Sequence, residues 1–141
     1  MGVAEKVEKH LADLANRMRG EVEIGFLENA TYPDGTQVAA VAAANEFGTS
    51  RAPARPFFRR MIAKESPGWG DKVAGLMQAT GKDGAKVLAL MGEDIEGALK
   101  QSINDLTSPP LAASTIKRKG FSKPLIDTSH MVNSTGYRVM R

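Results

Sequence analysis

The sequence predicts a small α+β domain in which a long helix and an alanine-rich helix pack against a small antiparallel or mixed sheet. Apolar residues recur every three or four positions over about 83–106, which indicates an amphipathic helix. They alternate with other residues near 21–28 and near 134–140, which indicates strands at two distant points of the chain. A length of 141 residues, with 42% hydrophobic and 25% charged, is typical of one soluble domain spanning residues 1–141.

Residues 1–20 are predicted to form an amphipathic N-terminal helix that ends at Gly20. Its apolar residues, spaced by four, four, three and four positions, are Val3, Val7, Leu11, Leu14 and Met18. After Gly20 the apolar period changes to two, and Val22, Ile24 and Phe26 fall on one face of a half-buried strand. The N-terminal helix therefore leads directly into the sheet.

A turn is predicted between this strand and the alanine-rich helix. The segment Tyr32–Thr36 reads YPDGT, in which Pro and Asp-Gly favour a tight turn. Thr36 can then cap a helix over about 37–47, whose alanines have high helix propensity and let another element approach closely. Gly48 is well placed as the C-terminal stop of that helix.

The middle of the chain is predicted to alternate between helices and breaks. Pro53 and Pro56 exclude regular helix up to Pro56, which suits the first position of a short helix to about residue 65. Residues 66–84 contain five glycines and a proline, so we expect a Gly-rich flexible connector despite helical spacing of a few apolar residues. The long helix follows, with a favourably ordered pair at Glu96 and Lys100.

The C-terminal residues are predicted to complete the sheet. Pro109 and Pro110 end the long helix. Asp127 or Thr128 can cap one short helical turn ahead of the final strand at 134–140. A sheet built from early and late strands, crossed by the long helix, follows from this order of elements.

The residues offer no catalytic or metal-binding constellation, so we predict a protein that is not an enzyme and has no cofactor. The absence of cysteine excludes disulfides, thiolate metal sites and thiol nucleophiles. His10 lies among charged helix positions and is predicted to be solvated, whereas His130 is interpreted as a cap or an interface polar group. Glu93, Asp94 and Glu96 are interpreted as a solvated helix face, because no second acidic cluster completes a site.

Three further functions are disfavoured. Residues 75–83 differ from a phosphate loop, since five residues separate the glycines and Asp83 stands where Ser or Thr binds magnesium. No apolar run approaches the roughly 20 residues of a membrane span, and the N-terminus is too charged for a secretory signal. We therefore expect synthesis in a cytoplasm and no membrane partner. The net charge of +3 does not by itself indicate nucleic-acid binding.

A basic and aromatic segment is the most informative local feature, because arginine and aromatic residues are enriched at interface cores. Its residues are Arg51, Arg55, Phe57, Phe58, Arg59 and Arg60. Two alternatives to an interface remain for this segment. It could be a solvated run of charges beside a buried pair of Phe residues, or a patch that binds phosphate groups of a nucleic acid. A second basic run consists of Lys117, Arg118 and Lys119. It could face DNA in a channel, or it could instead favour the C-terminal end of the helix in which it lies.

The order of short motifs resembles the head-tail joining, or tail-completion, family of tailed phages. The N-terminal half of the resemblance consists of Gly25-Phe26, Asp34-Gly35-Thr36, Asn45-Glu46-Phe47-Gly48-Thr49 and Pro53-Ala54-Arg55-Pro56-Phe57-Phe58. The C-terminal half consists of Pro124-Leu125-Ile126-Asp127-Thr128-Ser129-His130-Met131 and Tyr137-Arg138-Val139. It covers about 20–65 and 107–141, and it implies a non-catalytic α+β virion protein that forms a ring in the neck or at the head-proximal end of the tail.

The resemblance and the residue types predict the partners. These are further copies of the chain, in a hexamer or larger ring, and other neck and tail proteins such as a connector, a tail terminator or the tail tube. The expected interface residues are Tyr32, Asn45, Glu46, Phe47, Arg51, Arg55, Pro56, Phe57, Arg59, Arg60, Asp127 and Thr128. The alternative function is that of a small basic DNA-binding protein, whose affinity would fall steeply with salt.

Overall fold

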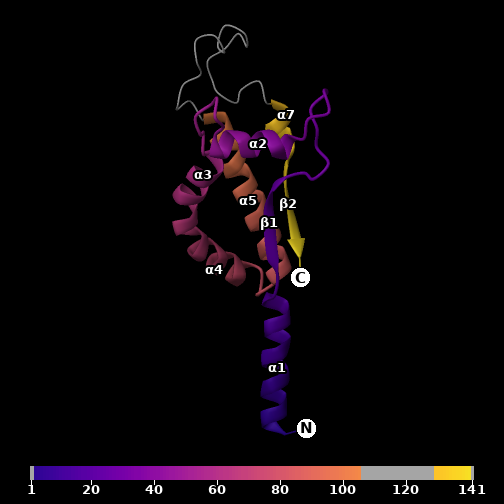
Figure 1. Ribbon diagram of the computed structural model, residues 1–141. Helices are drawn as coiled ribbons and strands as arrows, with labels where there is room; N and C mark the ends of the chain where they lie inside the picture. Colours follow the sequence, from indigo (N-terminus) through magenta and orange to yellow (C-terminus); the bar gives the residue numbers. More distant parts are fainter. Residues whose placement is uncertain (1, 106–128, 141) are drawn as a thin grey trace.

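The computed structural model describes residues 2–105 and 129–140, and its architecture confirms the α+β class. A two-stranded antiparallel sheet lies against a long helix, with shorter helices along one side and at one end of this unit and the N-terminal helix projecting from the other end (Figure 1). The elements, in chain order, are α1 (Val3–Met18), β1 (Glu21–Phe26), α2 (Val38–Phe47), α3 (Phe57–Glu65), the 3-10 turn η1 (Ser66–Gly68), α4 (Trp69–Ala79), α5 (Gly84–Asp105), α7 (Ser129–Asn133) and β2 (Thr135–Met140).

The sheet joins the two distant strands that the sequence predicts. Its register runs from Glu21 opposite Met140 to Phe26 opposite Thr135. One face packs on α5, where the Tyr137 ring lies directly against Gly92. Because an isolated two-stranded ribbon is marginal in water, this helix is needed to stabilise the sheet.

The hydrophobic core lies along one face of α5. Its helical residues recur at steps of four and are Val87, Met91, Ile95, Leu99 and Ile103. Val38, Ala42, Phe57, Met61 and Met131 from the surrounding helices complete the core. The predicted amphipathic pattern of this helix is confirmed, and so is the Glu96–Lys100 pair, at 3.4 Å.

The structure differs from the prediction at residues 66–84, which are largely helical. The 3-10 turn η1 leads into the eleven-residue helix α4, and Gly81 and Lys82, with positive φ angles, end it. Trp69, Leu76 and Met77 pack against the core. Partial burial of these three side chains offsets the helix penalty of about 1 kcal/mol for each interior glycine, so the predicted flexible connector is a helix instead.

Two local predictions are also corrected. Helix α2 begins after Gln37, whose side chain makes no capping bond, and the Thr36 backbone instead closes the preceding turn. The Glu96 side chain is only 17% exposed, and the hydroxyl of Thr135 donates a 3.2 Å hydrogen bond to it. It faces β2 because the sheet crosses α5 at this point, a long-range contact that helical spacing does not encode.

Helix α1 extends away from the rest of the described chain (Figure 1). None of its residues is buried, and Val3 is 80%, Val7 51%, Leu11 58% and Met18 53% exposed. Its amphipathic pattern is therefore present, but the apolar stripe lies in solvent. No helix among residues 2–105 and 129–140 has the length and apolar character required to cross a membrane.

Candidate subunit interface

The predicted interface residues Asn45–Arg60 form a rigid corner between α2 and α3. Glu46, at the end of α2, is 6% exposed and caps α3 from outside that helix. Its Oε2 accepts the backbone N–H of Phe58 at 2.9 Å, and its Oε1 accepts that of Arg59 at 3.1 Å. A carboxylate at a helix N-terminus satisfies unpaired donors and interacts favourably with the helix dipole.

Arg59 closes the corner from the solvent side. Its Nε donates to Glu46 Oε1 and its Nη2 donates to the Glu46 carbonyl, both at 2.8 Å. The same guanidinium lies 5.1 Å from the centre of the Phe47 ring, within the range of a cation–π contact. Phe47 is therefore held in place from one side while 70% of it remains exposed.

The loop between the two helices is tied back onto α2. Gly48 has a positive φ of 76°, and a Cβ there would lie 2.8 Å from the Ala54 nitrogen, so only glycine fits without strain. The Arg55 N–H donates to the Asn45 carbonyl at 2.6 Å, which brings the loop back to its start. Thr49 Oγ1 accepts backbone N–H groups within the loop.

Burial divides the predicted interface residues into two groups. Phe47, Arg51, Arg59 and Arg60 are exposed. Asn45, Pro56 and Tyr32 are partly buried, and Glu46, Arg55 and Phe57 are buried. Phe57 is 0% exposed and packs edge-on against Phe26, so it belongs to the subunit core. Because Glu46 and Arg55 are 6% and 7% exposed, the prediction of an interface role is corrected for these two side chains and for Phe57.

A shallow apolar groove of about 300 Å³ runs beside this corner. Its apolar walls come from α2, α3 and β1 and are Phe26, Ala39, Ala42, Ala43, Phe47, Phe57 and Phe58. The small side chains of α2 leave room for another element to approach, as the alanine-rich sequence predicts.

The turn at Tyr32–Thr36 is closed by its own backbone and side chains. The Asp34 carboxylate accepts the Thr36 N–H at 2.9 Å, and this hydrogen bond holds the pKa of Asp34 below its usual value. The Tyr32 ring lies 5.4 Å from that of His130, whose Nε2 contacts the Thr31 carbonyl. His130 is thus a polar link between the turn and α7. Asp127, Thr128, Lys117, Arg118 and Lys119 lie outside the described residues.

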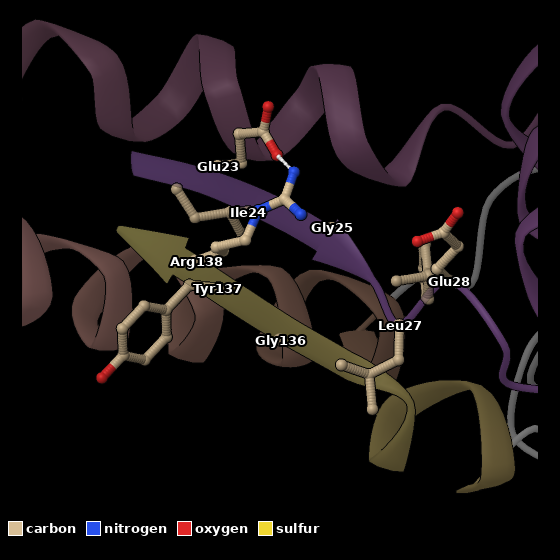
Figure 2. A pocket seen from close by; sticks show the side chains of 9 residues that line it. Glu23, Ile24, Gly25, Leu27, Glu28, Gly136, Tyr137 and Arg138 are labelled. Atoms are coloured by element: carbon tan, nitrogen blue, oxygen red, sulfur yellow. Dashed lines mark hydrogen bonds and ion pairs between the residues drawn. The ribbon is translucent and has the colours of Figure 1, made fainter. Parts of the chain in front are cut away.

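The outward face of the sheet carries a second concave surface that the sequence analysis does not single out. It is a trough of about 570 Å³ on the face opposite α5, and Figure 2 shows it from close by. Gly25 lies directly across from Gly136, so backbone forms its floor, which is bare at Gly25. The Glu23–Arg138 ion pair, at 2.6 Å, lies toward one end, and Leu27 reaches over Gly136 at the other. Glycine within each of two predicted strands is the signal that points to it.

The described residues hold no group of three or more His, Asp or Glu side chains placed to bind a metal ion. His10 is exposed on α1, as predicted. The candidate interface offers an exposed aromatic ring among arginines, an apolar groove and a trough with backbone at its floor. Comparisons of the chain with protein-family models, curated proteins and solved structures gave no match.

Proposed function

We propose that this chain is a structural subunit of a tailed-phage virion, which assembles into a ring at the neck or at the head-proximal end of the tail. It acts by binding other copies of itself and neighbouring neck or tail proteins. The observation that supports assembly most directly is helix α1, and the observation that supports this particular assembly is the resemblance of the motifs around the α2–α3 corner.

Helix α1 exposes apolar side chains that a binding partner could cover. Its sixteen residues approach the length below which an isolated helix is marginal in water, and it buries none of its own residues. Four large apolar side chains on it are more than half exposed, among them Val3 and Leu11. A contiguous apolar surface of this kind marks a protein–protein contact. A second subunit or a neck partner would supply the missing burial.

The α2–α3 corner adds a preorganised contact surface. Glu46, Arg59 and the loop bonds fix the backbone before any partner arrives, so little conformational entropy is lost when Phe47 is covered. Exposed arginines beside an exposed aromatic residue are the residue types of interface hot spots. This combination suits repeated, identical contacts around a ring.

The test is the native mass of the purified protein, together with negative-stain images. We expect a closed ring of six or more copies for the full chain, and a variant lacking residues 2–15 should assemble less or not at all. A stable monomer at all concentrations that also fails to bind neck or tail proteins would contradict the proposal. A dimer that forms only on short duplex DNA, with steep salt dependence, would favour the DNA-binding alternative.

A further inference from the structure

We infer that the Gly25–Gly136 trough is the docking site for the α2–α3 corner of a second copy of this chain, with Phe47 as the residue that enters it. This inference deepens the proposed function, on which it rests, because it assigns the two surfaces that meet between neighbouring subunits. It commits to a second copy as the occupant.

The fold of the single subunit does not explain why glycine stands at position 25. Gly25 has no positive φ angle, and a Cβ built on it meets no atom within 4 Å. A larger residue would fit, and β-branched or aromatic residues favour strands, whereas glycine disfavours them. A glycine that the subunit itself does not require indicates that another group approaches the bare backbone closely.

The shape and neighbours of the trough suit an aromatic ring. Gly25 leaves bare backbone at the floor, and the side chain of Leu27, 54% exposed, lies over the facing Gly136 and forms an apolar wall at that end. Aromatic side chains pack over strand glycines and shield their backbone from water. Phe47, at 70% exposure, is the most exposed aromatic residue that the described parts of the chain offer.

The charges around the two surfaces are complementary. Glu23 and Glu28 line the trough, and Glu21 lies beside it on β1. Arg138, opposite Glu23, is the basic residue of the lining, so acidic side chains outnumber basic ones at the trough. The corner presents exposed arginines, namely Arg51, Arg59 and Arg60, of which Arg59 is also paired with Glu46. Opposite charges at an interface rim speed association and disfavour wrong pairings.

Two different surfaces on each subunit make a heterologous contact. Each copy offers one corner and one trough, so the contact can repeat from copy to copy, and it closes into a ring when the rotation allows. A contact of this kind explains how one chain assembles into a ring without a second protein between copies.

The first experiment fills the trough. Gly25→Val should unfold at the wild-type temperature or above, because the new side chain meets open space, yet subunit association should weaken by about tenfold or more. Gly97→Ala is the matched control, since Gly97 also faces open space but lies on α5, away from the trough. It should leave association unchanged. Association of Gly25→Val within about twofold of wild type would overturn the inference.

The second experiment uses the absence of cysteine from the chain. Phe47→Cys and Glu28→Cys are prepared separately and mixed under mild oxidation, so that any mixed disulfide joins two molecules. We expect the mixed dimer to form well in excess of either homodimer. A mixed dimer no more frequent than the homodimers would overturn the inference.

The two readouts separate this inference from the proposed function. If wild type and Gly25→Val both form rings and no mixed disulfide is enriched, the docking inference fails and the ring-forming function stands. If the wild-type chain is monomeric at all concentrations, binds no neck or tail protein and forms no enriched mixed disulfide, both fail.

Discussion

Replacing Glu46 tests whether the α2–α3 corner is held by a buried cap. Glu46→Ala removes the acceptor of two backbone N–H groups, at 2.9 and 3.1 Å, and of Arg59 Nε at 2.8 Å. A hydrogen bond to a charged group contributes about 1.5–3 kcal/mol, and loss of a single helix cap costs about 1 kcal/mol. The Arg59 side chain is 57% exposed, so solvent screens its ion pair and we add at most about 1 kcal/mol.

We therefore expect Glu46→Ala to lower the free energy of unfolding by about 3 kcal/mol, a large fraction of the roughly 5–15 kcal/mol typical of a domain. Urea unfolding, followed by far-UV circular dichroism, should show the midpoint moving down by about 1–2 M. Glu46→Gln preserves the volume and one acceptor oxygen, so it should lose about half as much.

Arg59→Ala is the comparison that decides between the cap and the ion pair. It leaves both backbone bonds of Glu46 intact and should cost about 1 kcal/mol. The double variant should show a coupling of about 1 kcal/mol or less. If Glu46→Ala costs no more than Arg59→Ala, the ion pair rather than the helix cap holds the corner, and the reasoning is refuted.

Three further substitutions or deletions test the packing. Gly92→Ala should destabilise the fold by about 1–3 kcal/mol in thermal unfolding, because its Cβ would lie 2.5 Å from a carbon of the Tyr137 ring. Gly97→Ala on the same helix meets open space and should stabilise the fold by up to about 1 kcal/mol. Equal effects of the two substitutions would contradict the packing described for Tyr137. Deleting residues 2–15 should lower helix content but leave the melting temperature of the remainder within a few degrees, since α1 buries no residue, and a large drop would mean that α1 supports the fold. Phe57→Ala should cost about 3–5 kcal/mol in chemical denaturation, because its ring is 0% exposed; a fully stable variant that only fails to assemble would restore it as an interface residue.

The sequence by itself determined most of the element types. Helix and strand periods are local properties of the chain, so α1, both strands and the long buried face of α5 could be read directly. Alanine content and Gly48 located α2 and its end. The sequence predicted a sheet that is either antiparallel or mixed, because no local pattern specifies the relative orientation of two strands so far apart in the chain. The structure shows that β1 and β2 are antiparallel.

Only the tertiary structure decided what those residues do. Glu46 and Phe57 belong to one motif with Phe47 and Arg59, yet the first two are buried and the last two are exposed, because α3 folds back onto α2. Gly25 and Gly136 are 111 positions apart and become one surface through the strand register alone. Helix α4 forms despite its glycines because one side of it packs on α5 and the core. Burial and strand register are set by contacts between distant residues, and local periodicity does not contain them.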